Sequence, residues 1–214
     1  MSNMLTKYNA KPDYWDKGRR YIIKNDIILR DIILSVDTSH SLTRTQSSFQ
    51  TLAVAIIGQQ ISVAAASSVL SKLKINIQSL TANNLFKASD KLLKNSGLSR
   101  QKIEYLRILS EKFVKCPRFF YGFKHMNDEE VIAKLCELKG IGEWTAQMYL
   151  MFQLNRPNIM PMGDIGFINS AKRVYKIKEP VKKNIIKISK KWGNYKTIAV
   201  WYIWRITDPE VVQY

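Results

Sequence analysis

Cysteine, histidine and acidic residues are scarce in this sequence. The only cysteines are Cys116 and Cys136, and the only histidines, His40 and His125, lie apart from them and from each other. Structural zinc sites and iron–sulfur clusters need about four closely spaced cysteine or histidine ligands, and two cysteines make no disulfide framework. We therefore expect no zinc, no iron–sulfur cluster and no catalytic cofactor. Carboxylates, backbone groups or an unclustered ion remain to carry any chemistry.

Long apolar runs are missing as well. Runs such as IAVWYIW at residues 198–204 are far shorter than the roughly 20 residues that span a bilayer. Residues 1–20 contain no apolar core of a signal peptide. We expect a cytoplasmic monomer with reduced thiols and no membrane partner, associated with the nucleoid if the source is a bacterium.

The deficit of acidic residues leaves a strongly basic chain. Lysine and arginine number 34 against 17 aspartates and glutamates, which gives a formal charge of +17. Such an excess repels itself unless it meets a polyanion, so nucleic acid or an acidic membrane surface is the expected partner. The alternative is a compositional bias that favours lysine together with isoleucine and asparagine.

The apolar residues recur at helical spacing, and the alternating pattern of a half-buried strand is not found. One helix is expected over residues 22–34 and another from Phe49 through Gly58 into residues 59–73, with a polar loop at 37–48. Helices with an average length of about three turns would make the chain an all-α protein of roughly eight to eleven helices.

Capping residues and glycines mark the later helices. Ser99 is placed to cap one helix, and Asn127 with Glu130 three residues later is typical of a capping box. Two further helices are expected around residues 182–192 and 195–204, separated by glycine and asparagine.

The segment LCELKGIGEWTAQMYLMF at residues 135–152 is the most informative one. A helix is expected to end at Leu138, the chain to turn through residues 139–142, and a new helix to start at Glu143. The two glycines of the turn allow close approach to another chain, and the N–H groups that open the second helix suit a phosphate. The alternative is an ordinary corner between two helices.

Asp164 follows this hairpin, directly before a helix that starts IGFINSAKRVY. An aspartate at this position is typical of a plain N-cap. A helix amino terminus would also favour the ionised carboxylate. A negative charge beside a phosphate-binding hairpin is suited to stabilising a positively charged sugar in a transition state.

Four segments resemble one known family, the helix-hairpin-helix (HhH-GPD) DNA glycosylase superfamily. The hairpin LKGIGEWTAQMYLMF (138–152), followed by PMGDIG (161–166), is similar to its hairpin and its Gly/Pro-rich loop with a catalytic aspartate. Two further segments, FQTLAVAIIGQQISVAAA (49–66) and GLSRQKIEYLRILS (97–110), resemble the 3-methyladenine DNA glycosylase II branch of this superfamily. Together the resemblance covers about residues 45–205.

The resemblance implies an all-α, two-lobed fold with the active-site cleft between the lobes. Residues 1–45 would be an amino-terminal helical segment packed with the carboxyl-terminal lobe, and residues 164–214 would form that lobe. Residues 46–163 would form the central lobe, with the helix-hairpin-helix at about 129–153. The amino-terminal segment is too short and too helical for the β-domain of some relatives. The absence of an iron–sulfur loop argues against the endonuclease III and adenine-mismatch classes.

The resemblance also assigns roles in catalysis. Asp164 would be the catalytic carboxylate, which stabilises the oxocarbenium ion and orients or deprotonates the attacking water. Bifunctional relatives carry a lysine nucleophile in the hairpin where this chain has Trp144. An indole cannot attack the sugar, so we expect a monofunctional enzyme that leaves an abasic site.

Pocket and DNA contacts follow by the same resemblance. Trp144, Met148 and Tyr195 would line the substrate pocket, where aromatic rings stack on a positively charged alkylated purine. The alternative for both aromatic rings is core packing, and Met148 departs from the tyrosine of some relatives. Trp201 and Trp204 are expected in the core. DNA contacts are assigned to Gln59, Gln60 and Ser62 in the segment GQQIS (58–62). In the hairpin they are assigned to Lys139 and to the backbone amides of Gly140, Gly142, Trp144 and Thr145.

Within these groups each residue has its own expected part. Gln60 would be the wedge that fills the gap left by the flipped nucleotide, whereas Gln59 and Ser62 could instead hold a helix bend at Gly58. Lys139 would contact a phosphate or be a solvated charge. A monovalent cation, Na⁺ or K⁺, would lie on the backbone carbonyls of the hairpin, which the resemblance places at Cys136, Leu138 and Ile141.

The function implied is excision of alkylated purines of the 3-methyladenine and 7-methylguanine type from duplex DNA, by base flipping and hydrolysis, in base excision repair. One alternative is a glycosylase of the same superfamily for deaminated, oxidised or mismatched bases. Another is a protein that binds lesions without catalysis, against which Asp164 argues.

Overall fold

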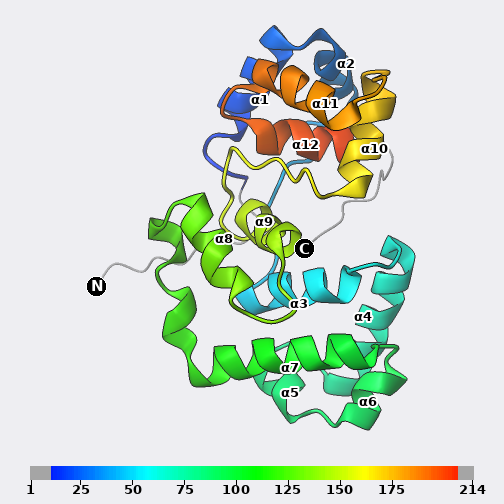
Figure 1. The fold of residues 1–214 in the computed structure, drawn as a ribbon, viewed down its shortest axis with the longest axis vertical. Helices are drawn as coiled ribbons and strands as arrows, with labels where there is room; N and C mark the ends of the chain where they lie inside the picture. The colour runs from blue at the N-terminus through cyan, green and yellow to red at the C-terminus, as the bar shows by residue number, and fades with distance from the viewer. Residues whose placement is uncertain (1–10, 207–214) are drawn as a thin grey trace. The chain divides into compact units, whose positions relative to one another are not determined.

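The computed structural model describes residues 11–206, and every regular element within them is a helix (Figure 1). Twelve α-helices and three short 3₁₀-helices occur there, so the all-α prediction is confirmed, although the expected number of helices was too low. None of the helices in this range is long and apolar enough to cross a membrane. The described chain divides into two compact units, one of residues 11–45 with 155–206 and one of residues 46–154.

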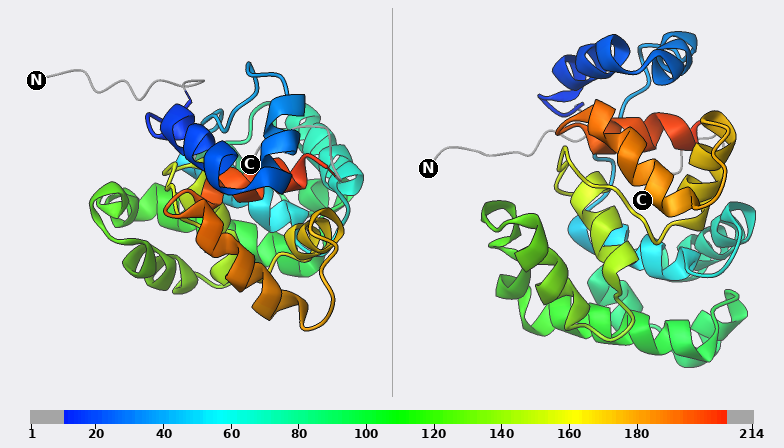
Figure 2. Two further views of the ribbon diagram at one scale, coloured as in Figure 1. Left: turned by 90° about the horizontal axis from the view of Figure 1, so that it is seen from above. Right: turned by 45° about the horizontal axis from the view of Figure 1, so that its top comes forward.

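The unit of residues 46–154 is built around the long helix α7, which packs against α3, α5 and α6, while α3 also packs against α4 and α9 (Figure 2). Its elements are α3 (Ser48–Gly58), α4 (Val63–Ile77), α5 (Ala82–Lys87), α6 (Asp90–Asn95), α7 (Arg100–Lys115), η1 (Pro117–Phe120), η2 (Phe123–His125), α8 (Asp128–Cys136) and α9 (Glu143–Phe152).

Side-chain caps set where most of these helices begin. Ser99 accepts a hydrogen bond from the Lys102 N–H, and the capping box of Asn127 and Glu130 is present, so both predicted starts are confirmed. Ser47 forms a second capping box with Gln50. Such caps satisfy N–H groups that have no partner inside the helix.

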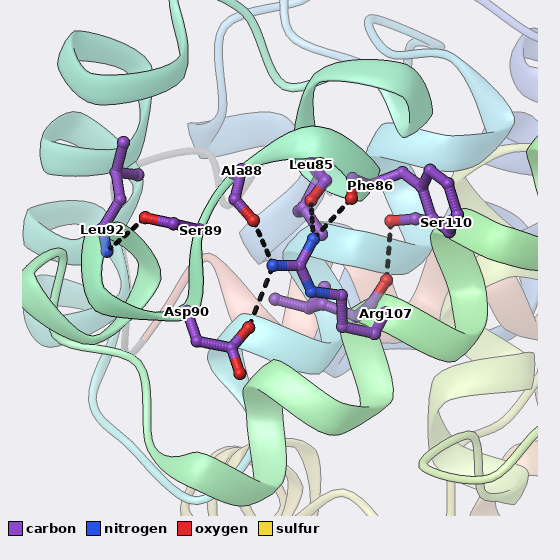
Figure 3. A network of polar contacts seen from close by, with 9 residues as sticks. Leu85, Phe86, Ala88, Ser89, Asp90, Leu92, Arg107 and Ser110 are labelled. Carbon is purple, nitrogen blue, oxygen red and sulfur yellow. Dashed lines mark hydrogen bonds and ion pairs between the residues drawn. The ribbon is translucent and has the colours of Figure 1, made fainter.

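Arg107 ties the short helices α5 and α6 to α7 (Figure 3). Its guanidinium donates to the carbonyls of Leu85 at 2.6 Å and Phe86 at 2.7 Å, and also to that of Ala88. It also forms an ion pair with Asp90 at 2.9 Å. One planar cation thus satisfies the carboxyl-terminal carbonyls of α5 and fixes the turn into α6.

The other unit contains residues from both ends of the described chain. Its elements are α1 (Trp15–Asn25), α2 (Ile27–Ser35), α10 (Ile165–Val174), α11 (Val181–Ser189), η3 (Lys190–Trp192) and α12 (Lys196–Trp204). The apolar helix α12 packs against α1, α2 and α10. Trp15, Trp192 and Trp201 are at most 1% exposed and form the centre of this core.

Asp26 interrupts the single helix that was expected over residues 22–34. Its backbone is extended, and its side chain caps α2 by accepting from the N–H groups of Ile28 and Leu29. The carboxylate is fully buried and also accepts from the Tyr175 hydroxyl at 2.8 Å and the Trp192 indole at 3.0 Å. Four donors around one buried carboxylate explain why the chain breaks there rather than continuing as a helix.

Three other boundaries differ from expectation. The expected helix through Gly58 ends at that residue and a new one starts at Val63, since Gln60 has a positive φ of 59°. Helix α8 ends at Cys136 rather than Leu138. Residues 155–163 were assigned to the central lobe from the sequence, but they belong to the unit that contains α12. Thr197 of α12 holds them there, since its N–H donates to the Pro157 carbonyl and its hydroxyl donates to the Arg156 carbonyl. The predicted lobes also included residues 1–10 and 207–214, which lie outside the described residues.

Candidate active site and DNA interface

The hairpin between α8 and α9 has the predicted form. Gly142 is the N-cap of α9, which starts at Glu143 as expected, and a glycine offers no side chain to cap the first turn. Gly142 is exposed, and the position that a Cβ would take there has no atom within 4 Å. The amino terminus of α9 therefore opens onto free space, where its N–H groups and dipole favour an anion such as a phosphate.

Gly140 allows the close packing behind this hairpin. Its φ of 92° lies in the left-handed region, and a Cβ there would be 2.2 Å from Cγ of Tyr105. A side chain is therefore excluded both by conformation and by space. The ring of Tyr105, on α7, supports the turn from behind.

Gln59 joins the segment after α3 to the hairpin. Its side-chain amide donates to the Gly140 carbonyl at 2.9 Å and to the Thr145 hydroxyl at 3.1 Å. Thr145 is 1% exposed, so its side chain is structural, and only its backbone N–H in the first turn of α9 remains a candidate for phosphate binding. Gln59 holds the hairpin rather than the bend at Gly58, which was the alternative considered from the sequence.

Gln60 is presented differently from its neighbour. It is exposed in a left-handed conformation, and no hydrogen bond joins its side chain to another residue of the described range. Such a conformation is uncommon outside glycine and tends to occur at functional sites. Beside it lies a hollow of about 270 Å³, which is lined by Gln59, Gln60, Ile61, Ser99, Gln101, Lys102 and Tyr105.

Ser62 and Lys139 have local partners. Ser62 is the N-cap of α4 and accepts from the Ala65 N–H at 3.2 Å. Lys139 is exposed and paired with Glu104 on α7. The hydrogen bond to that carboxylate raises the pKa of Lys139, so the ammonium stays protonated at neutral pH.

Asp164 is the N-cap of α10, and its Oδ1 accepts from the Phe167 N–H at 2.5 Å. The same oxygen accepts from the Trp204 indole N–H at 3.3 Å. Asp164 is partly buried, and a Cβ on Gly166 would lie 3.2 Å from Oδ1. The N-cap expected as the plain alternative is thus present, and it fixes a carboxylate between a helix amino terminus and an indole.

The three predicted pocket residues have different surroundings. Trp144 lies in the first turn of α9 and is partly buried. Met148, one turn later, has no exposed surface. Tyr195 precedes α12, and its ring lies 5.5 Å from that of Tyr21 and against the backbone of Gly18. Met148 and Tyr195 therefore take part in packing, and Trp144 and Tyr195 are both partly exposed.

The residues expected to hold a monovalent cation flank the turn. Cys136 ends α8, where carbonyls have no intrahelical donor, and burial raises the pKa of its thiol. The Leu138 carbonyl accepts from the Ile141 N–H at 2.9 Å and keeps a second lone pair. Backbone carbonyl oxygens are the type of ligand that a hard cation takes. Within the described residues no cluster of histidine, cysteine and carboxylate side chains suits a bound metal.

Two residues near the site were missed from the sequence. Trp204 was expected in the core, yet it is partly exposed and bonded to Asp164, whereas Trp201 is buried as expected. Tyr105 was not noticed at all. Tyr105 is distant in sequence from Gly140, which its ring supports, so no local pattern signals that contact. The indole N–H of Trp204, by contrast, required a partner.

These features define a helix-hairpin-helix protein with an aspartate at the start of a later helix, and comparison with known proteins identifies its family. The model of the family described as HhH-GPD superfamily base excision DNA repair protein matches residues 53–194. The match includes the hairpin, both glutamines and Asp164, and ends one residue before Tyr195. The chain therefore belongs to the HhH-GPD superfamily of base excision DNA repair proteins.

Individual proteins support this assignment. The putative DNA-3-methyladenine glycosylase YfjP of Bacillus subtilis is 37% identical over 53% of this chain and 40% of its own length. The alkylbase DNA glycosidase-like protein mag2 of Schizosaccharomyces pombe is 30% identical over 71% of this chain and 74% of its own. The 3-methyladenine DNA glycosylase Mag1 of the same yeast, solved with abasic DNA, matches the fold with a TM-score of 0.79 at 23% identity, over 92% of this chain and 98% of that one.

Proposed function

We propose that this chain is a monofunctional DNA glycosylase that excises alkylated purines, such as 3-methyladenine and 7-methylguanine, in base excision repair. The observation that carries the proposal is Asp164, held at the start of α10 by the Phe167 N–H and the Trp204 indole. The match to a base excision repair family across this residue, and relatives named as 3-methyladenine glycosylases, support it.

The reaction is hydrolysis of the bond between C1′ of the sugar and a purine nitrogen. The bonding electron pair leaves with the base, and C1′ gains positive charge that the Asp164 carboxylate stabilises. Water adds to C1′ and gives up a proton, for which the same carboxylate is the acceptor. A purine alkylated at N3 or N7 is already positive, so it departs as a neutral base without protonation, and an abasic sugar remains.

The hairpin supports hydrolysis rather than strand cleavage. Schiff-base formation at C1′ needs an amine at the position where this chain has Trp144. Trp144 instead offers an indole face, which attracts a cationic purine by about 0.5–2 kcal/mol. We assign it to the substrate pocket together with Met148, which follows one turn later on α9, and with Tyr195 as a second aromatic residue.

The DNA backbone would be bound at the amino terminus of α9. The N–H groups of the first turn and the Gly140–Gly142 backbone bind a phosphate, and Lys139 adds a charge nearby. Gln60, exposed beside the hollow on α7, enters the stack where the base has left. Carbonyls of Cys136, Leu138 and Ile141 would hold Na⁺ or K⁺, which adds positive charge to the phosphate site, and catalysis itself needs no cofactor.

The test is identification of the bases that the protein releases from duplex DNA. Methylated duplex is incubated with the protein, free bases are identified by mass spectrometry, and strand integrity is followed on a gel. Release of 3-methyladenine and 7-methylguanine with an intact abasic strand is expected. Preferential release of hypoxanthine, uracil or an oxidised base would contradict the substrate class, and a cut strand would contradict the monofunctional mechanism. We further propose that the protein acts as a monomer in the cytoplasm, at the nucleoid in a bacterial cell.

A further inference from the structure

A second hollow lies in the unit of residues 11–45 and 155–206, along α11 and beside the segment that precedes it. It has a volume of about 400 Å³ and is lined by Ile177, Lys178, Asn184, Lys187, Ile188 and Lys191. Helix α10 begins after Asp164 and ends at Val174, shortly before the first of these residues. Ten helical residues span about 15 Å, so the hollow is at the opposite end of α10 from the candidate catalytic carboxylate.

The rim of this hollow is cationic and unpaired. Lys178, Lys187 and Lys191 are exposed, and no ion pair joins any of them to a carboxylate in the described part of the chain. Residues 172–191 contain nine lysines and arginines and a single acidic residue. That residue, Glu179, already faces Lys172 at 3.5 Å and accepts from the Val181 N–H. The charge of these three lysines therefore has no acidic partner among residues 11–206.

The wall of the hollow is apolar. Ile177 is 8% exposed and Ile188 is partly exposed. The hydrocarbon stems of the lysines continue this surface up to their charged ends. The one uncharged polar side chain of the lining, Asn184, already donates to the Lys178 carbonyl at 2.9 Å. An occupant thus meets apolar atoms inside and ammonium groups at the edge.

We propose that this hollow, the α11 pocket, binds an acidic peptide segment of a partner protein that carries one aromatic or aliphatic side chain. The apolar side chain enters between Ile177 and Ile188, and carboxylates on either side of it meet the three lysines. A DNA backbone would pair with the lysines but has no side group that fills the apolar wall, and the phosphate site proposed above is at α9. Charge complementarity and apolar burial together favour the peptide.

Binding is tested with the full chain by fluorescence anisotropy. The probe is a short labelled peptide of aspartate, glutamate and glycine with one central phenylalanine, and a second peptide has alanine in its place. The double variant Lys187→Glu/Lys191→Glu removes the rim charge. Its matched control is Lys182→Glu/Lys183→Glu, which reverses two exposed lysines of α11 that do not line the pocket. Ile188→Ala shortens the wall without changing charge, and circular dichroism melting checks that all variants fold.

We expect the rim variant to weaken phenylalanine-peptide binding by about tenfold or more and the control to weaken it by about twofold at most. Replacing phenylalanine by alanine in the peptide, or Ile188 by alanine in the protein, is expected to weaken binding about threefold to tenfold. Equal losses in the two double variants, or indifference to the phenylalanine, would overturn the proposal. A loss of affinity for undamaged duplex DNA as large as the loss for peptide would assign the surface to DNA instead. Base release does not enter this test, so its outcome is independent of the proposed activity.

Discussion

The two adjacent glutamines after α3 allow a sharp test, because the structure gives them different tasks. The Gln59 side chain donates to the Gly140 carbonyl at 2.9 Å and to the Thr145 hydroxyl at 3.1 Å, whereas the exposed Gln60 side chain has no partner in the described range. Replacing Gln59 with alanine should loosen the hairpin in the free protein. Replacing Gln60 with alanine should leave the free protein unchanged.

The magnitude follows from the two hydrogen bonds. Each contributes about 0.5–1.5 kcal/mol net, so Gln59→Ala should lower the free energy of unfolding by about 1–3 kcal/mol. If DNA binding must restore the hairpin geometry, up to the same free energy is lost from affinity. Since about 1.4 kcal/mol is a factor of ten in a dissociation constant, the loss in affinity for abasic DNA reaches about 5-fold to 150-fold.

Urea unfolding and fluorescence anisotropy with an abasic duplex measure both quantities. Gln60→Ala is the control for the first measurement, with an expected change in unfolding free energy within about 0.5 kcal/mol. Gln60→Ala, which should not change stability, should slow single-turnover base release, because it removes the side chain that fills the gap left by the flipped base. If both variants destabilise the protein equally, or if Gln59→Ala leaves stability and DNA affinity intact, the assignment of Gln59 to the hairpin is refuted.

Three further predictions concern other residues. Trp204→Phe removes the indole N–H that donates to Asp164 at 3.3 Å and should slow base release about threefold to tenfold, since one hydrogen bond contributes about 0.5–1.5 kcal/mol. An unchanged rate would show that Trp204 does not position the carboxylate. Asp26→Asn leaves the buried Tyr175 and Trp192 donors poorly paired and should destabilise the protein by about 1–3 kcal/mol in thermal melting, and a neutral result would contradict a charged acceptor there. Lys139→Ala should reduce the slope of log Kd against log salt by about 0.9 if Lys139 contacts one phosphate. Because Glu104 raises the pKa of Lys139, this contribution of the wild-type lysine should persist at neutral pH and be lost only as the pH rises through that raised pKa. Loss of the contribution near pH 7 would argue against a phosphate contact by Lys139.

Local signals in the sequence were enough for much of the fold. The capping box at Asn127, the cap at Ser99 and the glycine turn before Glu143 act over three or four residues, so they can be read without the tertiary structure. The break at Asp26 could not be read in this way. It depends on Tyr175 and Trp192, which are distant in the chain and supply half of the donors to its buried carboxylate.

In the candidate site, too, the features that depend on local sequence were predicted and those that depend on distant contacts were not. Asp164 was placed correctly at a helix start because an N-cap is a local feature, and Gln60 was singled out within a family-like segment. The task of Gln59 was not foreseen, since its partners lie more than 80 residues further along the chain. Trp204 was assigned to the core for a similar reason, as the apolar pattern of α12 does not show which indole reaches a carboxylate.

The charge on Asp164 is the centre of the proposed mechanism, and Asp164→Asn removes it with little change of structure. Asparagine is an equally good N-cap and still accepts from the Phe167 N–H and the Trp204 indole. The decisive measurement is the single-turnover rate of 3-methyladenine release by this variant, together with its affinity for an abasic duplex. A rate at least about 100-fold lower with affinity within about threefold of the wild type is predicted. Release at the wild-type rate would contradict the account.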